Sequence, residues 1–471
     1  MGTEATRDLA RELERFRALI HLVTSADRAD SPIPTKIFAF SRPSEMHQFV
    51  DSRNVVGMFK PGLRQNQILL TKYSRRMGAS EVILHEYVHF IVRNGSSRVY
   101  PVWYDEGFAE FLSSARARRD QMVIGALPDL RISSFRYGKW MPLSRIISGK
   151  SYADFSDRDL PMFYAQSWAL VHYLTIGRSS DRELTRQLNG YFLRIENGVE
   201  PEVAFEKAFG ESIEDVDATI QSWMRMKKWT IVGVPLSRLE YDRSEPEVQV
   251  PSEDSVAVSL GQLSLSFGDG AKSEPFFTAA IEKNPGNARA HAGFGDAMKF
   301  QKRWEEAEPH FLRAVELDPD DILNLIDLAE YLQDLATANL YPERRKDLLL
   351  EARDLYRRSL EKDPINPEAR AQLGWTYLAL GDDSAKGVSM VEKAFETLPS
   401  SPQVSRLLVK AYVATGQEEK AREILSRFIA VRETGELEKS LREQVAEIRK
   451  RLFGSVSRNE SEENEDTAEA H

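Results

Sequence analysis

The sequence predicts an α+β domain over residues 1–230 and an all-α domain over residues 253–454. The first part mixes helical periodicity with short β-rich runs bounded by Pro, Gly and Asn. The second part contains helical segments that recur with prolines at nearly constant spacing. Residues 231–252 are rich in Pro, Ser and charged residues without a clear period, and we expect a linker there. Residues 455–471 are polar and acidic with almost no apolar content, so we expect them to be disordered.

The α+β domain is predicted to begin with an amphipathic helix over residues 4–22, because apolar residues recur there at helical spacing with charged residues between them. Three β-rich runs follow, at residues 35–40, 55–59 and 67–71. They indicate a small sheet. Further helices are expected downstream, at residues 184–195, 203–209 and 213–226.

The stretch after these runs is the most informative about function, because His85 and His89 are four residues apart. On a helix their side chains project from one face, one turn apart, so that two neutral imidazoles can bind one Zn²⁺. Glu86, one step round the helix, can then act as a general base toward a water molecule. The segment has the signals of a helix, since Ser80 can cap its start and the Asn-Gly pair at 94–95 can end it.

A second run supplies a further carboxylate, Glu106, which lies 17 positions after His89 and can sit on the next helix. Three protein ligands with one open position are typical of a catalytic rather than a structural zinc site. The alternative is a core helix whose histidines are simply hydrogen-bonded, but this leaves the spacing of His85, His89 and Glu106 unexplained. The sequence therefore predicts a catalytic zinc site.

In these two runs the sequence resembles the gluzincin metallopeptidases of the peptidase-MA-like type and, more distantly, the zinc aminopeptidases. Those families share HExxH followed by a Trp-x-x-Glu-Gly-x-Ala pattern on the next helix. The resemblance implies a zincin-like catalytic domain in which His85, His89 and Glu106 bind Zn²⁺ and Glu86 is the general base. Glu110 matches a carboxylate one turn after the ligand glutamate, which would orient a ligand histidine through its other ring nitrogen.

The comparison with these families also covers Tyr164 and Asp105, whereas His172 is judged from its place on an apolar helix. Tyr164 matches the tyrosine of the aminopeptidase Tyr-x-x-Gly segment, whose hydroxyl hydrogen-bonds the tetrahedral intermediate, with Ser167 in place of the glycine. The alternative is that Tyr164 only caps or packs a core helix. Asp105 replaces an asparagine common in the aminopeptidases and is expected to face solvent or to cap the helix. His172 is expected to be a buried, hydrogen-bonded histidine rather than a ligand.

The gluzincins also have a sheet beside the zinc helix, whose edge strand commonly binds the substrate backbone by strand addition. The run at 67–71, just before the helix, is the candidate for that edge. The Gly-Ala-Met-Glu-Asn loop, with which the aminopeptidases bind a free α-amine, has no counterpart here. This argues against a strict aminopeptidase and leaves endopeptidase or other amide hydrolysis open. The residues that select a substrate stay unknown.

The all-α domain shows a regular spacing of its prolines. Pro251, Pro285 and Pro319 are 34 positions apart, and Pro364 and Pro399 are 35 positions apart. A period near 34 with two helices per unit is the tetratricopeptide signature. We therefore expect a solenoid of tetratricopeptide repeats.

Inside the clearest unit, Gly295 is expected where two helices pass closely, and Phe311 at the large apolar position. An insertion is expected around residues 338–346, and a capping helix over residues 437–453. Stacked helix pairs form a concave surface that usually binds peptides or proteins. The sequence leaves open whether the repeats bind a partner or substrate, mediate self-association or only brace the catalytic domain.

Composition excludes several classes of function. The net charge is −10, which argues against a general nucleic-acid binder, and no apolar run approaches the roughly 20 residues that cross a bilayer. There are no cysteines, which rules out thiolate ligands, thiol catalysis and disulfides. Residues 1–25 are amphipathic rather than apolar, so a soluble, cytoplasmic protein is expected as the sequence stands. Export is expected if the true start, with a signal peptide, lies upstream.

Two functions compete. The first is a zinc-dependent peptidase whose repeats recruit or select a peptide or protein substrate. The second is an interaction protein, in which a catalytically silent peptidase-like domain accompanies repeats that perform the function. The complete set of ligands, base, accessory carboxylate and tyrosine favours the peptidase, because a silent relative would be expected to lose at least one of them. The sequence does not determine the oligomeric state.

Overall fold

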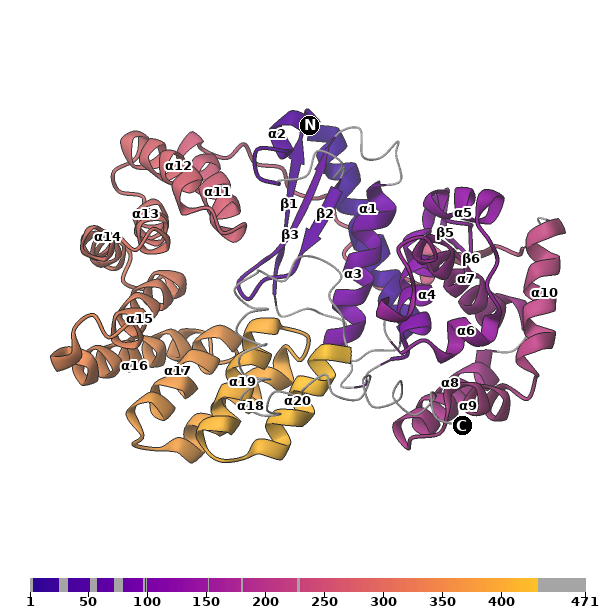
Figure 1. The fold of residues 1–471 in the computed structure, drawn as a ribbon. Helices are drawn as coiled ribbons and strands as arrows, with labels where there is room; N and C mark the ends of the chain where they lie inside the picture. Colours follow the sequence, from indigo (N-terminus) through magenta and orange to yellow (C-terminus); the bar gives the residue numbers. More distant parts are fainter. Residues whose placement is uncertain are drawn as a thin grey trace, which may run out of the picture.

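The computed structural model describes residues 3–24, 33–50, 57–71, 79–95, 98, 100–150, 152–178, 181–226 and 229–430. Helices dominate these residues, and the strands form two small sheets. The elements up to residue 241 form an N-terminal body, and the helices after residue 252 form a repeat arc that curves round one side of it (Figure 1).

The predicted capping helix at 437–453 and the predicted tail at 455–471 lie outside the described residues. Among the helices that are described, none has the length and apolar character to cross a lipid bilayer.

The first sheet has three strands in the order β1-β3-β2. They are β1 (Thr35–Phe40), β2 (Gly57–Lys60) and β3 (Asn66–Thr71). In β3, Ile68 pairs in parallel with Ile37 and antiparallel with Phe59. The prediction that the run at 67–71 is an edge strand is therefore wrong. Neighbours pair with β3 on both sides and all of its residues are buried, so its backbone is not free to add a substrate strand.

Four helices form the main core of the N-terminal body: α1 (Thr3–Thr24), α3 (Ala79–Gly95), α4 (Val102–Ser113) and α7 (Leu160–His172). Helices α4 and α7 approach each other at Gly107. A Cβ atom on Gly107 would lie 2.4 Å from the carbonyl oxygen of Ser167. The absence of a side chain at Gly107 therefore sets the distance between the helix that carries Glu106 and the helix that carries Tyr164.

The second sheet joins β4 (Arg116–Arg118), β5 (Gln121–Ile124) and β6 (Val232–Pro235) in that order. Strand β6 lies in the segment 231–252, for which we expected a linker. It pairs antiparallel with β5, and Leu239, just after it, is buried in the main core. The N-terminal body thus extends past residue 230. A strand this short and mostly exposed shows no alternation of apolar and polar residues that would predict it. It is recognised only by its pairing with β5.

The remaining helices of this body pack round these four, and most of them add buried side chains to the same core. They are α2 (Pro43–Met46), α5 (Ile132–Tyr137), α6 (Leu143–Ser148), α8 (Asp181–Glu196), α9 (Pro201–Phe209) and α10 (Ile213–Met226). Helices α8, α9 and α10 are the three that the sequence predicted downstream of Tyr164.

The repeat arc consists of successive antiparallel helix pairs. Its helices are α11 (Glu253–Ser266), α12 (Gly270–Lys283), α13 (Ala288–Phe300), α14 (Trp304–Leu317), α15 (Ile322–Thr337), α16 (Arg345–Lys362), α17 (Pro367–Leu380), α18 (Ser384–Thr397), α19 (Pro402–Ala414) and α20 (Glu418–Ala430). As predicted, Gly295 lies against Phe311, whose ring would be 3.0 Å from an added Cβ. The predicted insertion lies between α15 and α16, where a short 3-10 helix, Pro342–Arg344, precedes α16.

The repeat arc contacts the N-terminal body near both of its ends. Leu263 of α11 packs with Phe38 and Leu69 of the first sheet. Ser400, between α18 and α19, donates a hydrogen bond from its hydroxyl to the Asn94 side chain at 2.7 Å. Because Asn94 lies near the end of α3, the arc is joined to the helix that carries His85 and His89.

Candidate metal centre

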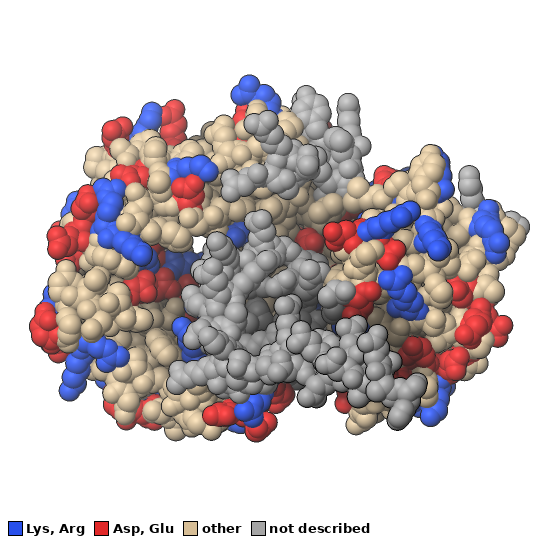
Figure 2. All heavy atoms as spheres, in the orientation of Figure 1, with Lys and Arg blue, Asp and Glu red and all other residues tan. Residues whose placement is uncertain are grey.

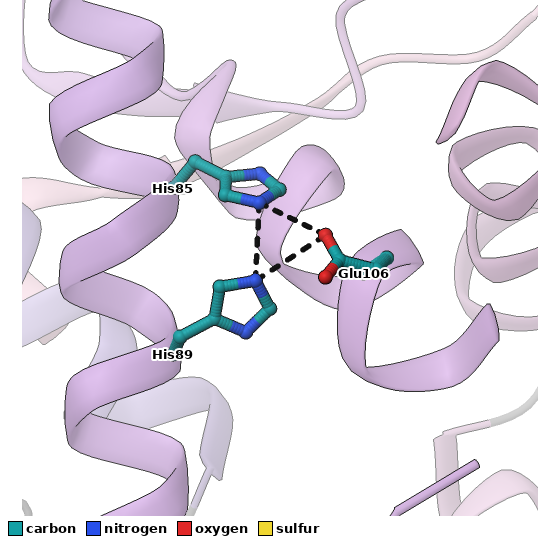
Figure 3. Close-up of side chains that lie close together, drawn as sticks. All are labelled: His85, His89 and Glu106. Atoms are coloured by element: carbon teal, nitrogen blue, oxygen red, sulfur yellow. Dashed lines mark hydrogen bonds and ion pairs between the residues drawn. The ribbon is translucent and has the colours of Figure 1, made fainter. Parts of the chain in front are cut away.

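Helix α3 presents both predicted histidines toward α4. Ile83, Val88 and Ile91 are buried in the main core and hold the helix in place. Helical spacing then puts His85 and His89 together on another side of α3, one turn apart (Figure 3).

Figure 3 shows His85, His89 and Glu106 pointing to a common centre, which we call the metal centre. The two Nε2 atoms are 3.0 Å apart, and Oε2 of Glu106 lies 3.0 Å from Nε2 of His85 and 3.3 Å from Nε2 of His89. All three residues are buried. Tetrahedral zinc with bonds of about 2.0–2.1 Å separates its ligand atoms by roughly 3.3 Å. The spacing of these three atoms therefore fits a tetrahedral ion.

A carboxylate faces the other nitrogen of each imidazole. Nδ1 of His85 lies 3.3 Å from Oε1 of Glu110, and Nδ1 of His89 lies 3.2 Å from Oδ1 of Asp105. Since both carboxylates are held ionised and can only accept hydrogen bonds, we infer that each Nδ1 carries the proton. With a metal ion in place of any proton on Nε2, each Nε2 would direct a lone pair to the centre. Zinc proteins commonly place a carboxylate behind a ligand histidine in this way.

The prediction that Asp105 faces solvent or caps the helix is wrong. Its side chain is only 13% exposed, and it accepts a hydrogen bond from Nε of Arg93 at 3.2 Å in addition to facing His89. The sequence held a sign of this contact, because Arg93 lies one turn after His89 on the same helix and both side chains can meet one carboxylate. In the same manner, Nε of Arg131 donates to Glu110 at 3.0 Å. Each accessory carboxylate is thus neutralised by an arginine.

Tyr152 belongs to the metal centre, although the sequence analysis did not identify it. Its buried hydroxyl donates a hydrogen bond to Oε1 of Glu106. This leaves Oε2 of Glu106 for the two imidazoles. Tyr152 lies in a 3-10 turn 46 residues after Glu106, so no local pattern in the sequence points to it.

The charges of the metal centre favour a cation. Burial opposes a positive charge on His85, but hydrogen bonds with Glu106 and Glu110 outweigh burial and raise its pKa to about 10. Burial likewise opposes ionisation of Glu106, yet the two histidines lower its pKa. The pKa of Asp105 is also lowered despite burial, mainly by Arg93. The carboxylates therefore stay ionised at neutral pH.

Glu86 and Tyr164 lie beside the metal centre. Glu86 follows His85 on α3 and is half-buried. The Tyr164 ring, on α7, has its centroid 6.4 Å from that of His85, and the Arg131 guanidinium carbon lies 4.7 Å from the Tyr164 centroid. Burial, followed by the charge of Glu106, raises the pKa of Tyr164, so its phenol keeps its proton at neutral pH. The hydroxyl can therefore act as a hydrogen-bond donor.

His172 lies apart from the metal centre, as the sequence predicted. It is buried, and its Nε2 is 2.8 Å from the carbonyl oxygen of Thr230. Ser167 faces Gly107 across the contact of α4 with α7. In the part of the chain that the structure describes, His85, His89 and Glu106 are the only set of three His, Asp or Glu side chains that converges closely enough to hold one ion.

Two family models match the chain, and both describe tetratricopeptide repeats. They cover residues 264–328 and 355–386. Both segments lie within the repeat arc, and neither reaches the metal centre.

Two curated relatives are similar to part of the chain. The tetratricopeptide repeat-containing protein trd-1 of Caenorhabditis elegans is 25% identical over 216 residues, which are 46% of this chain and 25% of that protein. Superkiller protein 3 of Schizosaccharomyces pombe is 29% identical over 135 residues, which are 28% of this chain and 10% of that protein. The matches therefore span a quarter or less of the length of these relatives.

Solved structures similar to the chain include TTC0263, a thermophilic TPR protein of Thermus thermophilus, at 19% identity over 41% of this chain and 98% of that one, with a TM-score of 0.37. Another is YrrB, a TPR protein with an unusual peptide-binding site, at 19% identity over 41% of this chain and 90% of that one, with a TM-score of 0.28. The family models, the proline period and the observed helix pairs agree. The repeat arc, as far as the structure describes it, is a helical solenoid that contains tetratricopeptide repeats.

Proposed function

We propose that the chain is a zinc-dependent peptidase whose tetratricopeptide repeats bind proteins. The observation that supports the peptidase most directly is the convergence of His85, His89 and Glu106, whose nitrogen and oxygen donors suit zinc. Their order along the chain is also that of the gluzincins, and we propose a zincin-like fold for the N-terminal body. Protein binding by the repeats is supported by the family models.

Zinc held by these three residues would polarise the carbonyl of the bond to be cleaved and make a water molecule more acidic. The Glu86 carboxylate would accept a proton from the attacking water and later donate it to the nitrogen of the leaving amine. The Tyr164 hydroxyl would donate a hydrogen bond to the carbonyl oxygen as negative charge develops on it. Tyr152 would keep Glu106 in position throughout.

The accessory carboxylates have a separate task. Glu110 and Asp105 would hold the protons on Nδ1 of His85 and His89, which keeps both Nε2 lone pairs directed at the ion. Arg93, behind Asp105, neutralises a carboxylate that would otherwise be costly to bury.

The comparisons favour a second candidate function better than they favour the peptidase. Both matching family models describe repeats, and neither includes a residue of the metal centre. In this second function the chain is an interaction protein that binds a partner through its repeats. Its N-terminal body would then serve as a scaffold without hydrolytic activity.

Metal analysis and a peptide-library cleavage assay on the same preparations distinguish the two functions. For a peptidase, we expect about one zinc per wild-type chain. The Glu86→Gln variant should keep the zinc and lose turnover by about 10²–10⁴-fold. His89→Ala should lose both. His310→Ala, which changes a histidine of the repeat arc, is the matched control and should retain both.

Bound zinc without cleavage of any library member by the wild type would support the interaction protein. Failure to bind zinc after reconstitution would contradict the metal centre itself. Unchanged turnover in Glu86→Gln would rule out the proposed base.

A further inference from the structure

The loop between β2 and β3 extends toward the repeat arc (Figure 1), where Arg64 meets three carboxylates. Its Nε donates to Oε2 of Glu368 at 2.7 Å, its Nη2 donates to Oε2 of Glu330 at 3.1 Å, and its Nη1 donates to Asp327. Asp327 and Glu330 lie on α15, whereas Glu368 lies on α17. These are the first helices of two successive pairs, so a single guanidinium bridges two repeats. We call the site that Asp327, Glu330 and Glu368 form round this guanidinium the Arg64 groove.

The contacts of the Arg64 groove match the shape of a guanidinium. The Arg64 side chain is 24% exposed, while the side chains of Asp327 and Glu368 are 0% and 7% exposed. Arginine presents its N–H groups in a rigid planar fork, whereas lysine offers one compact ammonium. Each of the three carboxylates accepts a hydrogen bond from a different nitrogen of the guanidinium. We therefore expect this arrangement to favour arginine over lysine.

The repeats carry more acid in this groove than their own bases neutralise. Besides the three partners of Arg64, Asp296 and Asp334 lie close by, and the repeats contribute only Arg289 and Lys299 as bases among the residues that form these ion pairs. Figure 2 shows acidic and basic side chains meeting on the inner side of the arc. Burial and the charge of Glu368 raise the pKa of Glu330 to about 8, so these acids disfavour one another's ionisation and a cation from outside the repeats stabilises them.

An apolar cluster lies next to the acidic one. Leu63, which directly precedes Arg64, packs against Ala371, Ala394 and Val404 of α17, α18 and α19. The repeats thus contact two neighbouring side chains of the loop in two different ways. Together the two clusters contact a Leu-Arg pair.

We propose that the Arg64 groove is the protein-binding site of the repeats, and that its ligand is an exposed segment of a partner protein carrying an apolar residue followed by arginine. The chain's own Leu63 and Arg64 occupy this site as an internal competitor. Exchange of one guanidinium for another leaves the buried charges balanced, whereas withdrawal of Arg64 alone does not. The proposal depends on the repeats and not on the metal centre, so it stands if the peptidase is disproved.

The test uses the full chain and a fluorescent synthetic peptide with the sequence of residues 57–67. In the wild type, the tethered loop competes at an effective concentration in the millimolar range, so the peptide should bind weakly. In Arg64→Ala the competitor loses its guanidinium, and the peptide should bind at least about tenfold more tightly. A peptide with alanine in place of the arginine should bind neither protein.

Three further variants serve as controls. Adding Asp327→Asn to Arg64→Ala should remove the gain in affinity. Arg186→Ala changes an arginine whose side chain is 81% exposed, and it should behave like the wild type. Arg64→Lys keeps the charge without the fork and should bind the peptide with intermediate affinity. This variant decides the question if circular dichroism shows that Arg64→Ala does not fold.

One result would overturn the proposal. That result is equally weak binding of the arginine and alanine peptides to the wild type, to Arg64→Lys and to folded Arg64→Ala. Arg64 would then be only a brace between the N-terminal body and the repeat arc.

Discussion

The metal centre and the Arg64 groove are both clusters of titratable and charged groups, but they are completed differently. In the groove, acids on α15 and α17 are met by a guanidinium of the same chain. At the metal centre, His85, His89 and Glu106 direct their donor atoms at one another across 3.0–3.3 Å. Such donors repel unless a proton or a cation lies among them. The Arg64 groove therefore receives its cation from the same chain, whereas the metal centre favours a cation from outside the chain.

The two clusters also differ in how far apart their members lie in the sequence. His89 and Glu106 are 17 residues apart, whereas Arg64 is 263 residues from Asp327. All residues of the metal centre belong to the N-terminal body, whereas Arg64 reaches the acids of the groove only when that body and the repeat arc are in contact. Substitutions at the two clusters should therefore change different properties of the protein.

The largest expected effect is at the metal centre. Glu106→Gln replaces a ligand carboxylate with a neutral amide, and we expect zinc content to fall to background with turnover lost as well. Elemental analysis after zinc reconstitution measures this. The isosteric change Glu211→Gln, outside the centre, should leave zinc content unchanged. Full zinc occupancy in Glu106→Gln would show that this carboxylate is not a ligand.

The next effect concerns the groove. Arg64→Ala removes the arginine partner of Glu368 and leaves Asp327 with Arg289, and we expect the free energy of unfolding to fall by about 3–5 kcal/mol while zinc content stays the same. Denaturant unfolding and metal analysis of one preparation test both parts. Arg186→Ala should change stability by no more than about 0.5 kcal/mol. A loss below about 1 kcal/mol for Arg64→Ala would mean that the groove does not join the two bodies.

A smaller effect is expected from Tyr164→Phe. Loss of one hydrogen-bond donor to the developing oxyanion should lower kcat by about 10²–10³-fold, with zinc content and stability retained. Steady-state kinetics on a library-derived substrate measure it. Tyr137→Phe is the matched control, because Tyr137 is 79% exposed. If Tyr164→Phe turned over substrate at the wild-type rate, Tyr164 would be only a packing residue.

The smallest effects should come from the accessory carboxylates. Asp105→Asn and Glu110→Gln each weaken the hold on one Nδ1 proton, and we expect zinc affinity to drop by about 10–100-fold in each variant. Competition with a zinc chelator gives the affinities. A change confined to Glu110→Gln would indicate that Asp105 serves Arg93 and not His89.

Part of the metal centre could be predicted because its geometry is local. Helical spacing alone places His85 and His89 on one face of α3. A second run 17 positions on supplied Glu106, and the family resemblance then added Glu110. Tyr152 could not be predicted, because it reaches Glu106 from a turn whose neighbours in sequence carry no repeating pattern.

The two wrong predictions about the fold also concern contacts between segments that are distant in the sequence. The composition of the run at 67–71 indicated a strand correctly, but its position within the sheet depends on which strands pair with it. Strand β6 was missed because pairing with β5, and not its own residues, stabilises it. In the repeats, by contrast, each helix pair contacts mainly its neighbours, so the proline period was enough to identify them.

The amino-acid sequence by itself determined the features set by spacing along the chain: the helix with its two histidines, the repeat period, and the lack of thiol chemistry. Only the tertiary structure decided which carboxylate faces which imidazole and which arginine fills the groove of the repeats. The physical reason is that periodicity fixes neighbours within one helix, whereas contacts between distant segments depend on how whole elements pack.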